Sequence, residues 1–427
     1  MSRAERRLLQ LTLLALALWA AMFCRSALGP LQETMRLSLG FSDNQMALLQ
    51  GAAMALPMAL CSVPLGVLAD RFSRVGLVRV VVALMPVSCA LSALASRFPT
   101  LFLARCLAGL CSAAVLILGF STIGDLYAPE ERGRASMVMA SAEILGAPVS
   151  FALGGWLVVH AGADFGVASW RAALWTMGAL LLPLALLMLL LREPARRERL
   201  RAAPSLLLLW PRLWQYRAVA LPILVARGMV WLADGAVFVW AAPSFSRRFH
   251  LGADRIGAIM GVVLLVSGLA GPALGGPLAD FCQRRGGPRR TVRAMAGVAL
   301  ASIPLALFNF LPTPGTAAAV MVVFLTLGFM TATAGVTVSI IVIPGELRGA
   351  YLGMTFVVGS VFFVGLAPLA VSTLSGVLGG GGMVGEALAL ICAAASLLGA
   401  AVFALSSRFF PTAALPAELA QFDYGLR

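Results

Sequence analysis

Residues 66–74, GVLADRFSR, close one long apolar block, and residues 276–284, GPLADFCQR, close another. A second pair repeats at a similar distance, since Arg132 with Gly133 recurs as Arg348 with Gly349. Both pairs are separated by about half of the 427 residues. The repeats predict that the chain is built as two similar halves.

Composition places most of this chain in a membrane. Hydrophobic residues make up 60% and charged residues only 12%, whereas soluble proteins carry about 25% charged residues. The apolar residues form blocks of about 20, long enough to cross a bilayer as helices. The first block is too long for a signal peptide and lacks a small-residue cleavage pattern. We expect about twelve spans, at residues 8–28, 43–68, 77–95, 99–124, 135–160, 170–191, 218–242, 254–279, 292–311, 316–343, 350–376 and 386–406.

The predicted fold is an all-α membrane protein of two pseudo-symmetric six-helix bundles. The N-terminal bundle is expected at residues 1–191 and the C-terminal bundle at residues 218–410. An arginine-rich cytoplasmic linker, residues 192–217, joins them, and residues 411–427 form a cytoplasmic tail. Parallel six-span repeats occur in secondary transporters, which hold substrate near the midplane between the halves.

The formal charge of +14 reflects the orientation of the chain in the membrane rather than nucleic-acid binding. With the N-terminus inside, the inner loops carry most of the arginines and the outer loops carry few. Because positive residues favour cytoplasmic loops, both termini are predicted to be cytoplasmic. We expect an integral protein of a bacterial inner membrane.

Charges around the repeated loop predict a gate at the cytoplasmic face. Asp70 is expected to lie against a helix N-terminus and pair with an arginine, while Gly66 allows close helix approach. The alternative is a solvated loop with ordinary charges. Asp125 is expected either to pair with Arg71 or Arg74 or to remain a helix-end charge in water. The predicted gate residues are Gly66, Asp70, Arg71, Arg74, Asp125, Arg132, Asp280, Arg284 and Arg348.

Ionisable residues inside the apolar blocks form a second candidate site, because such groups usually face a partner or a wet cavity. The two carboxylates are candidates for loading and releasing a proton. Structural interpretations remain open for each of these ionisable residues. Arg25 and Arg105 could be anchors at the outer interface. Arg227 and Asp234 could form an intrahelical pair, and Glu143 could lie close enough to the helix end to reach water. The set is Arg25, Arg105, Glu143, Arg227 and Asp234, with Trp231 on the helix face of the last two.

The sequence shows no motif for enzymatic catalysis, metal binding or cofactor binding. The chain contains no phosphate-binding loop, nucleophile elbow or paired-carboxylate site. Its seven cysteines show neither CxxC nor Cys/His spacing. We therefore expect no enzymatic activity, no metal site and no cofactor.

The repeated loop resembles the signature of the major facilitator superfamily, and Arg105 with Gly109 resembles its fourth-span motif. The resemblance covers nearly the whole chain and is strongest to the spinster-like branch. It implies alternating access, with proton-linked movement of lipids or other amphipathic molecules in some relatives. The supporting stretches are LGFSDNQMALL at 39–49, DLYAPEERGR at 125–134, Trp170 with Arg171, REP at 192–194, and residues 240–243.

The chain departs from that branch where mechanism matters. Cys24 stands where an acidic residue usually precedes the span-one arginine, and the glutamate usual after the span-four glycine is replaced near Ser112. Phe281 stands where the second loop copy usually has an arginine. Ser112 therefore joins the predicted cavity set, and Glu143 and Asp234 remain as proton carriers.

The function expected is secondary active transport of a small amphipathic or anionic organic substrate, lipid-like or drug-like, by proton-coupled alternating access. The alternatives are a drug-type exporter or an uncoupled facilitator and, from another class, a non-transporting membrane sensor. The expected partners are a small-molecule substrate, protons and membrane lipids. We expect the chain to act as a monomer.

Overall fold

The structure, a computed structural model, describes residues 3–128, 131–161, 168–194 and 206–412, and its regular elements there are all helical. Within these residues, eleven helical segments are long and apolar enough to cross a membrane. One of them, Ala253–Phe310, has 58 residues, whereas a single crossing needs about 20. The predicted all-α membrane fold with about twelve spans is confirmed.

The long segment is divided at two adjacent glycines. Gly286 has φ −179° and ψ 21°, and Gly287 has φ 61° and ψ −164°. Glycine adopts the positive φ of Gly287 without a steric penalty because it lacks a Cβ atom. The helix α11 (Ala253–Leu305) therefore consists of two helical parts separated by non-helical backbone.

The chain divides into two compact units. Unit 1 comprises Met1–Arg199 and Ala241–Leu265, and unit 2 comprises Leu200–Trp240 and Val266–Arg427. The sequence instead assigns residues 241–265 to the C-terminal bundle. Parts of the predicted linker and tail lie outside the described residues, so the predicted domain boundaries stay a prediction.

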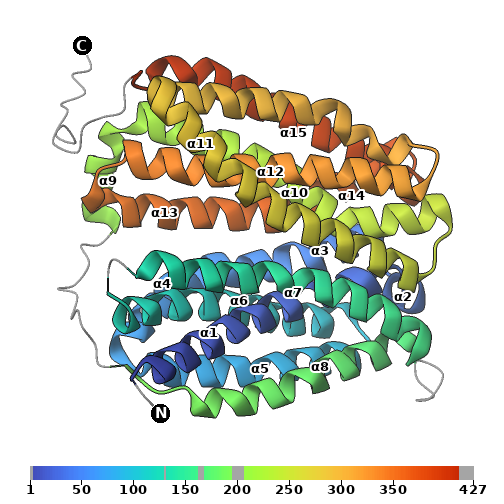
Figure 1. The fold of residues 1–427 in the computed structure, drawn as a ribbon. Coiled ribbons are helices and arrows are strands. Elements are labelled where there is room, and N and C mark those ends of the chain that lie inside the picture. The colour runs from blue at the N-terminus through green and yellow to red at the C-terminus, as the bar shows by residue number, and fades with distance from the viewer. Residues whose placement is uncertain (1–2, 129–130, 162–167, 195–205, 413–427) are drawn as a thin grey trace. The chain divides into compact units, whose positions relative to one another are not determined.

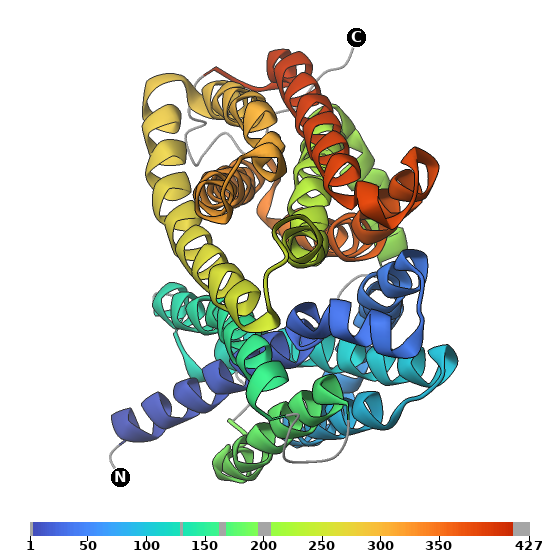
Figure 2. The same cartoon turned by 90° about the vertical axis from the view of Figure 1, so that its right-hand side faces the viewer.

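Unit 1 is a helical bundle (Figures 1 and 2). It includes the end of α10 (Arg217–Phe249) and the beginning of α11. Its remaining elements are α1 (Arg3–Ser26), η1 (Gly29–Leu31), α2 (Gln32–Leu39), α3 (Asp43–Gln50), α4 (Ala52–Arg71), α5 (Arg74–Leu94), α6 (Phe98–Leu126), α7 (Arg132–His160), α8 (Ser169–Leu187) and η2 (Met188–Leu190). Helix α1 packs against α5, α6, α7 and α8, and α5 packs against α6 and α8. The N-terminal helix is thus central to the packing of this unit.

Unit 2 contains a helix interrupted by a π-helical turn between α13 and α14. Such turns widen the helical hydrogen-bond pattern and are frequent at functional sites. The elements are α9 (Leu206–Gln215), α10 (Arg217–Phe249), η3 (Ala306–Phe310), α12 (Pro314–Val342), α13 (Gly345–Gly359), the π turn η4 (Ser360–Leu366), α14 (Ala367–Leu378), η5 (Gly381–Met383), α15 (Val384–Ser406) and η6 (Ser407–Phe409). Helix α9 lies inside the segment predicted as a linker.

Glycines allow close backbone contact between neighbouring helices of unit 1. A Cβ atom added to Gly146 of α7 would lie 2.6 Å from the carbonyl oxygen of Trp19 in α1. A Cβ atom added to Gly109 of α6 would lie 2.7 Å from the carbonyl oxygen of Met54 in α4. Small residues at such contacts let membrane helices approach and gain van der Waals packing.

We predict that Gly146→Ala lowers the thermal unfolding midpoint of the purified protein in detergent. The added methyl group would collide with backbone, and overpacking of this kind costs typically 1–3 kcal/mol. Gly133→Ala is the matched control, because no described residue lies within 4 Å of a Cβ atom at that position of the same helix. Equal midpoints for the two variants would contradict the close contact between α1 and α7.

Candidate functional site

A buried ion pair joins the beginning of α5 to the end of α6. The guanidinium of Arg74 donates through Nη1 to Oδ2 of Asp125 at 2.5 Å and to the carbonyl oxygen of Ser121 at 3.3 Å. Both charged side chains are buried, whereas Arg71 is exposed. Of the partners weighed for Asp125, Arg74 is therefore the one this structure shows, and the helix-end charge in water is not observed.

The N-terminus of α5 is capped by Glu193, which follows α8 in the chain. Its carboxylate accepts hydrogen bonds from the backbone N–H of Arg74 at 3.1 Å and of Val75 at 2.9 Å. The Ser73 hydroxyl donates to the same carboxylate at 2.5 Å. A carboxylate at this position satisfies free backbone N–H groups and complements the helix dipole. The sequence predicts a contact of this kind for Asp70, and the side chain of Asp70 lies outside the described residues.

Two repeated arginines make the same backbone contact in the two units. Arg132 donates through Nε to the carbonyl oxygen of Tyr127 at 3.3 Å, five residues earlier. Arg348 donates through Nε to the carbonyl oxygen of Ile343 at 3.0 Å, also five residues earlier. These carbonyls lie at the ends of α6 and α12, where the last helical acceptors lack intrahelical partners. The sequence repeat thus corresponds to a repeated structural contact.

The second copy of the loop differs from the first. Asp280 and Arg284 are both exposed, and no ion pair to either is found among the described residues. Phe281 instead lies under two guanidinium groups, 4.4 Å from Arg285 and 5.6 Å from Arg290. Cation–π contact therefore occurs where the superfamily signature usually has an arginine.

The two signature glycines, Gly66 and Gly276, have no close helix neighbour among the described residues. A Cβ atom added to Gly66 or to Gly276 would have nothing within 4 Å. The close helix approach expected of Gly66 therefore has no observed partner within the described residues and stays a prediction. The role of these glycines in a gate stays a prediction.

Unit 2 buries an acidic side chain in a slot formed by a glycine. Asp234 of α10 is 2% exposed, and a Cβ atom added to Gly328 of α12 would lie 2.6 Å from its Cγ. Its Oδ2 atom has no hydrogen-bond partner among the described residues. A buried polar group of this kind is costly unless it has a partner, so Asp234 stands out as a functional candidate.

About two helical turns away on α10, Arg227 occupies a similar slot. The side chain is 4% exposed, and a Cβ atom added to Gly335 would lie 2.6 Å from its Cδ. Its guanidinium lies 4.4 Å from the ring centroid of Trp231. Its Nε and Nη1 atoms lack hydrogen-bond partners within the described part of the chain. Cation–π contact thus satisfies the charge only in part.

The spacing on α10 bears on the structural alternative for these two residues. Arg227 and Asp234 are seven residues apart, which corresponds to about 10.5 Å along a helix. No ion pair between them is found in the described chain, and each side chain has its own glycine on α12, namely Gly335 and Gly328. The intrahelical-pair interpretation is therefore wrong for this structure.

The remaining cavity residues lie in unit 1. Arg105 is buried and donates to the carbonyl oxygens of Arg25 at 2.7 Å and Cys24 at 3.5 Å. It thereby caps the last turn of α1, which differs from interfacial anchoring. The hydroxyl of Ser112 also bonds α1, at the carbonyl oxygen of Ala21, at 3.3 Å.

Glu143 of α7 and Arg25 of α1 interact electrostatically. The thiol of Cys24, beside Arg25, contacts the hydroxyl of Ser88 at 3.3 Å and the thiol of Cys89 at 3.7 Å. The structure therefore groups Arg25, Arg105, Ser112 and Glu143 in unit 1, and Arg227, Trp231 and Asp234 in unit 2. A cavity shared by both groups stays a prediction.

We predict that Arg74→Ala and Asp125→Ala each destabilise the protein strongly, because each removes the opposite charge that compensates a buried one. Breaking a buried pair in this way costs about 3–5 kcal/mol, and thermal unfolding in detergent measures it. Arg71→Ala is the control, and a change within about 0.5 kcal/mol is expected for this exposed side chain. Replacing both partners, as Arg74→Met with Asp125→Leu, should recover most of the loss. Equal midpoints for Arg74→Ala and Arg71→Ala would contradict the buried pair.

Comparison with known proteins places this architecture in a family. The sequence model of the Major Facilitator Superfamily matches residues 14–365. Among curated proteins, a probable efflux pump, mfs2, of Aspergillus flavus is 26% identical over 215 residues. That alignment covers 43% of this chain and 49% of the relative, so it spans about half the length of the relative.

Solved structures share the fold across almost the entire chain. A bacterial homologue of the human lysosomal transporter Spinster, inward-facing and unoccupied, has a TM-score of 0.81 at 20% identity, over 95% of this chain and 98% of that one. A D-xylose-proton symporter has a TM-score of 0.68 at 16% identity, over 91% and 96% of the two chains. With its repeated loop signature, its spanning helices and the family match over most of its length, the chain belongs to the Major Facilitator Superfamily of membrane transporters.

Proposed function

We propose that this transporter is a secondary active transporter that couples proton movement to alternating access, with Asp234 as the proton carrier. The observation that carries this proposal is the burial of Asp234 in the Gly328 slot, where one carboxylate oxygen has no hydrogen-bond partner within the part of the chain that the structure describes. Carboxyl groups inside membrane spans commonly serve as proton relays. Membership of a transporter family agrees with the expectation that the chain is not an enzyme.

Coupling follows if the protonation of Asp234 changes together with its surroundings. A proton on Oδ2 removes the charge while the side chain is buried against α12, and its release is favoured when water reaches the site. Each conformation then favours one protonation state, and a proton gradient can drive the exchange between conformations. Glu143 is a weaker candidate for this role, because it interacts with the charge of Arg25.

The substrate that we propose is small, amphipathic and anionic or zwitterionic. Arg227 offers buried N–H groups that have no hydrogen-bond partner among the residues described, and the ring of Trp231 lies against the same guanidinium. A guanidinium beside an aromatic ring suits a ligand that has a carboxylate or phosphate and an apolar body. We also propose that both termini are cytoplasmic, that the protein acts as a monomer, and that it resides in a bacterial inner membrane.

The export direction has one specific observation in its favour. The curated relative from Aspergillus flavus is named as a probable efflux pump, so an exporter of drug-like molecules is our second candidate. An uncoupled facilitator remains distinguishable by experiment, because its substrate counterflow would be the same with and without a pH gradient.

We predict that Asp234→Asn abolishes uptake driven by a pH gradient in proteoliposomes, since the amide cannot release a proton. The probes are a lysophospholipid, benzoate and ethidium, each labelled, and binding is followed by thermal shift, which the variant should retain. Glu143→Gln should lower uptake but keep its dependence on the gradient. Glu386→Gln, at the first turn of α15, is the control that should behave as wild type. Unchanged gradient dependence in Asp234→Asn would overturn the assignment.

We predict that Arg227→Gln weakens binding of the anionic and zwitterionic probes by about tenfold and leaves ethidium binding unchanged, because a charge-assisted hydrogen bond contributes roughly 1.5–3 kcal/mol. Binding is measured by thermal shift at fixed pH. Arg293→Gln, at an exposed site on α11, is the control. Equal losses for benzoate and ethidium would show that Arg227 supports the fold rather than an anionic group.

A further inference from the structure

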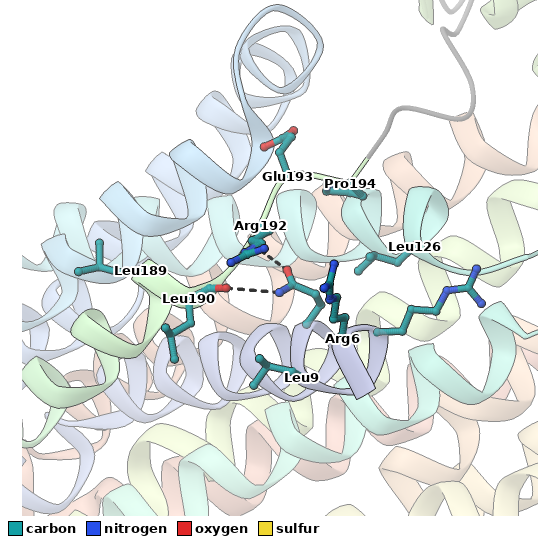
Figure 3. Close-up of a pocket in the computed structure, with 10 residues that line it drawn as sticks. Arg6, Leu9, Leu126, Leu189, Leu190, Arg192, Glu193 and Pro194 are labelled. Carbon is teal, nitrogen blue, oxygen red and sulfur yellow. Dashed lines mark hydrogen bonds between the residues drawn. The ribbon is translucent and has the colours of Figure 1, made fainter. Parts of the chain in front are cut away.

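A pocket of about 590 Å³ opens at one end of unit 1 (Figure 3). It lies between the first turns of α1, the end of α6 and the chain that follows α8. Its polar rim includes Arg6, Arg7 and Arg192, and its apolar wall includes Leu9, Leu189 and Leu190. None of these residues belongs to the gate or cavity sets, and the pocket is thus separate from the proposed proton site.

The charge of the pocket is positive. Three guanidinium groups line it, and the one acidic residue in its wall, Glu193, has its carboxylate bound at the N-terminus of α5. Figure 3 shows Glu193 pointing away from Arg6 and Arg192. Arg7 has a distant ion pair, 3.9 Å from Glu131. For Arg6 and Arg192, the described residues provide no ion-pair partner.

A buried amide holds the two sides of the pocket together. Gln10 of α1 accepts a hydrogen bond from the backbone N–H of Arg192 at 2.7 Å and donates to the carbonyl oxygen of Leu190 at 3.4 Å. Arg79 of α5 donates to the carbonyl oxygens of Met188 and Leu189, both at 3.2 Å. The backbone next to Arg192 is therefore fixed before any ligand binds, which lowers the entropic cost of binding.

An apolar surface continues from the pocket. Leu189 is 63% exposed and Leu190 is 53% exposed. In a chain that crosses a membrane, this surface suits acyl chains, whereas a soluble anion would gain nothing from it. The exposed leucines at this end of α8 and in η2 are Leu182, Leu186, Leu187, Leu189 and Leu190.

We propose that this pocket binds the phosphate headgroup of an anionic phospholipid, held by Arg6 and Arg192 with its acyl chains along α8. Guanidinium groups bind phosphate oxygens by paired hydrogen bonds, and basic pockets between membrane helices bind anionic lipid headgroups. The shared chemistry is a phosphate anion, and the adjoining leucines favour a lipid over free phosphate. Such a lipid would tie the start of α1 to the segment that leaves α8.

The test is thermal unfolding of the full chain in detergent, titrated with phosphatidylglycerol, phosphatidylcholine, inorganic phosphate or glycerol 3-phosphate. Wild type should be stabilised by phosphatidylglycerol far more than by the other three. Arg6→Gln with Arg192→Gln should weaken the apparent affinity for phosphatidylglycerol by about tenfold or more, since each basic side chain near a headgroup contributes roughly fivefold. Arg97→Gln, outside the pocket, is the matched control.

Three results would overturn the proposal. They are an unchanged phosphatidylglycerol response in the double variant, equal responses to phosphatidylglycerol and phosphatidylcholine, and reproduction of the response by inorganic phosphate or glycerol 3-phosphate alone. If the double variant does not fold, Arg6→Gln alone decides, because Arg6 is exposed. A loss of phosphatidylglycerol affinity in this single variant supports the proposal, and an unchanged affinity contradicts it.

Discussion

The cost of burying charge in an apolar environment is the constraint on which the rest of this structure depends. Only 12% of the residues are charged, and the described ones that are buried fall into two classes. Arg74 and Asp125 compensate each other directly, while Arg105 is compensated by backbone carbonyls at the end of α1. Asp234 and Arg227 show no comparable hydrogen bonds to the described residues, and this difference separates structural charges from candidate functional ones.

Helix ends account for much of the remaining polar chemistry. Glu193 caps α5, and Arg132 and Arg348 bond the last carbonyls of α6 and α12. These contacts satisfy backbone groups that a helix leaves free at its ends. Arg132 and Arg348 each donate to the carbonyl oxygen five residues earlier, so both units satisfy a helix end in the same way. The ion pair of Arg74 with Asp125 has no counterpart at Asp280 in the described part of unit 2, so a gate built from these residues would be asymmetric.

Features encoded locally could be predicted from the sequence, and features that depend on distant contacts could not. Apolar block length and the repeated loop predict the membrane fold, because both can be recognised in the order of residues without knowing which helices pack together. The choice between Arg71 and Arg74 stayed open, because it depends on which residue begins α5. Glu193 lies 119 residues from Arg74, and no local pattern assigns it to that helix. In the sequence, Gly328 looks like any other small residue of a membrane span, and only the folded structure shows that it contacts Asp234.

The most direct test of the central claim is proton release or uptake by the purified protein upon ligand binding, followed with a pH-sensitive dye in weakly buffered detergent solution. The ligand is the probe that gives the largest thermal shift. The account predicts a ligand-dependent proton change in wild type and in Glu386→Gln, and none in Asp234→Asn at ligand concentrations that saturate all three. An equal proton change in Asp234→Asn would contradict the account.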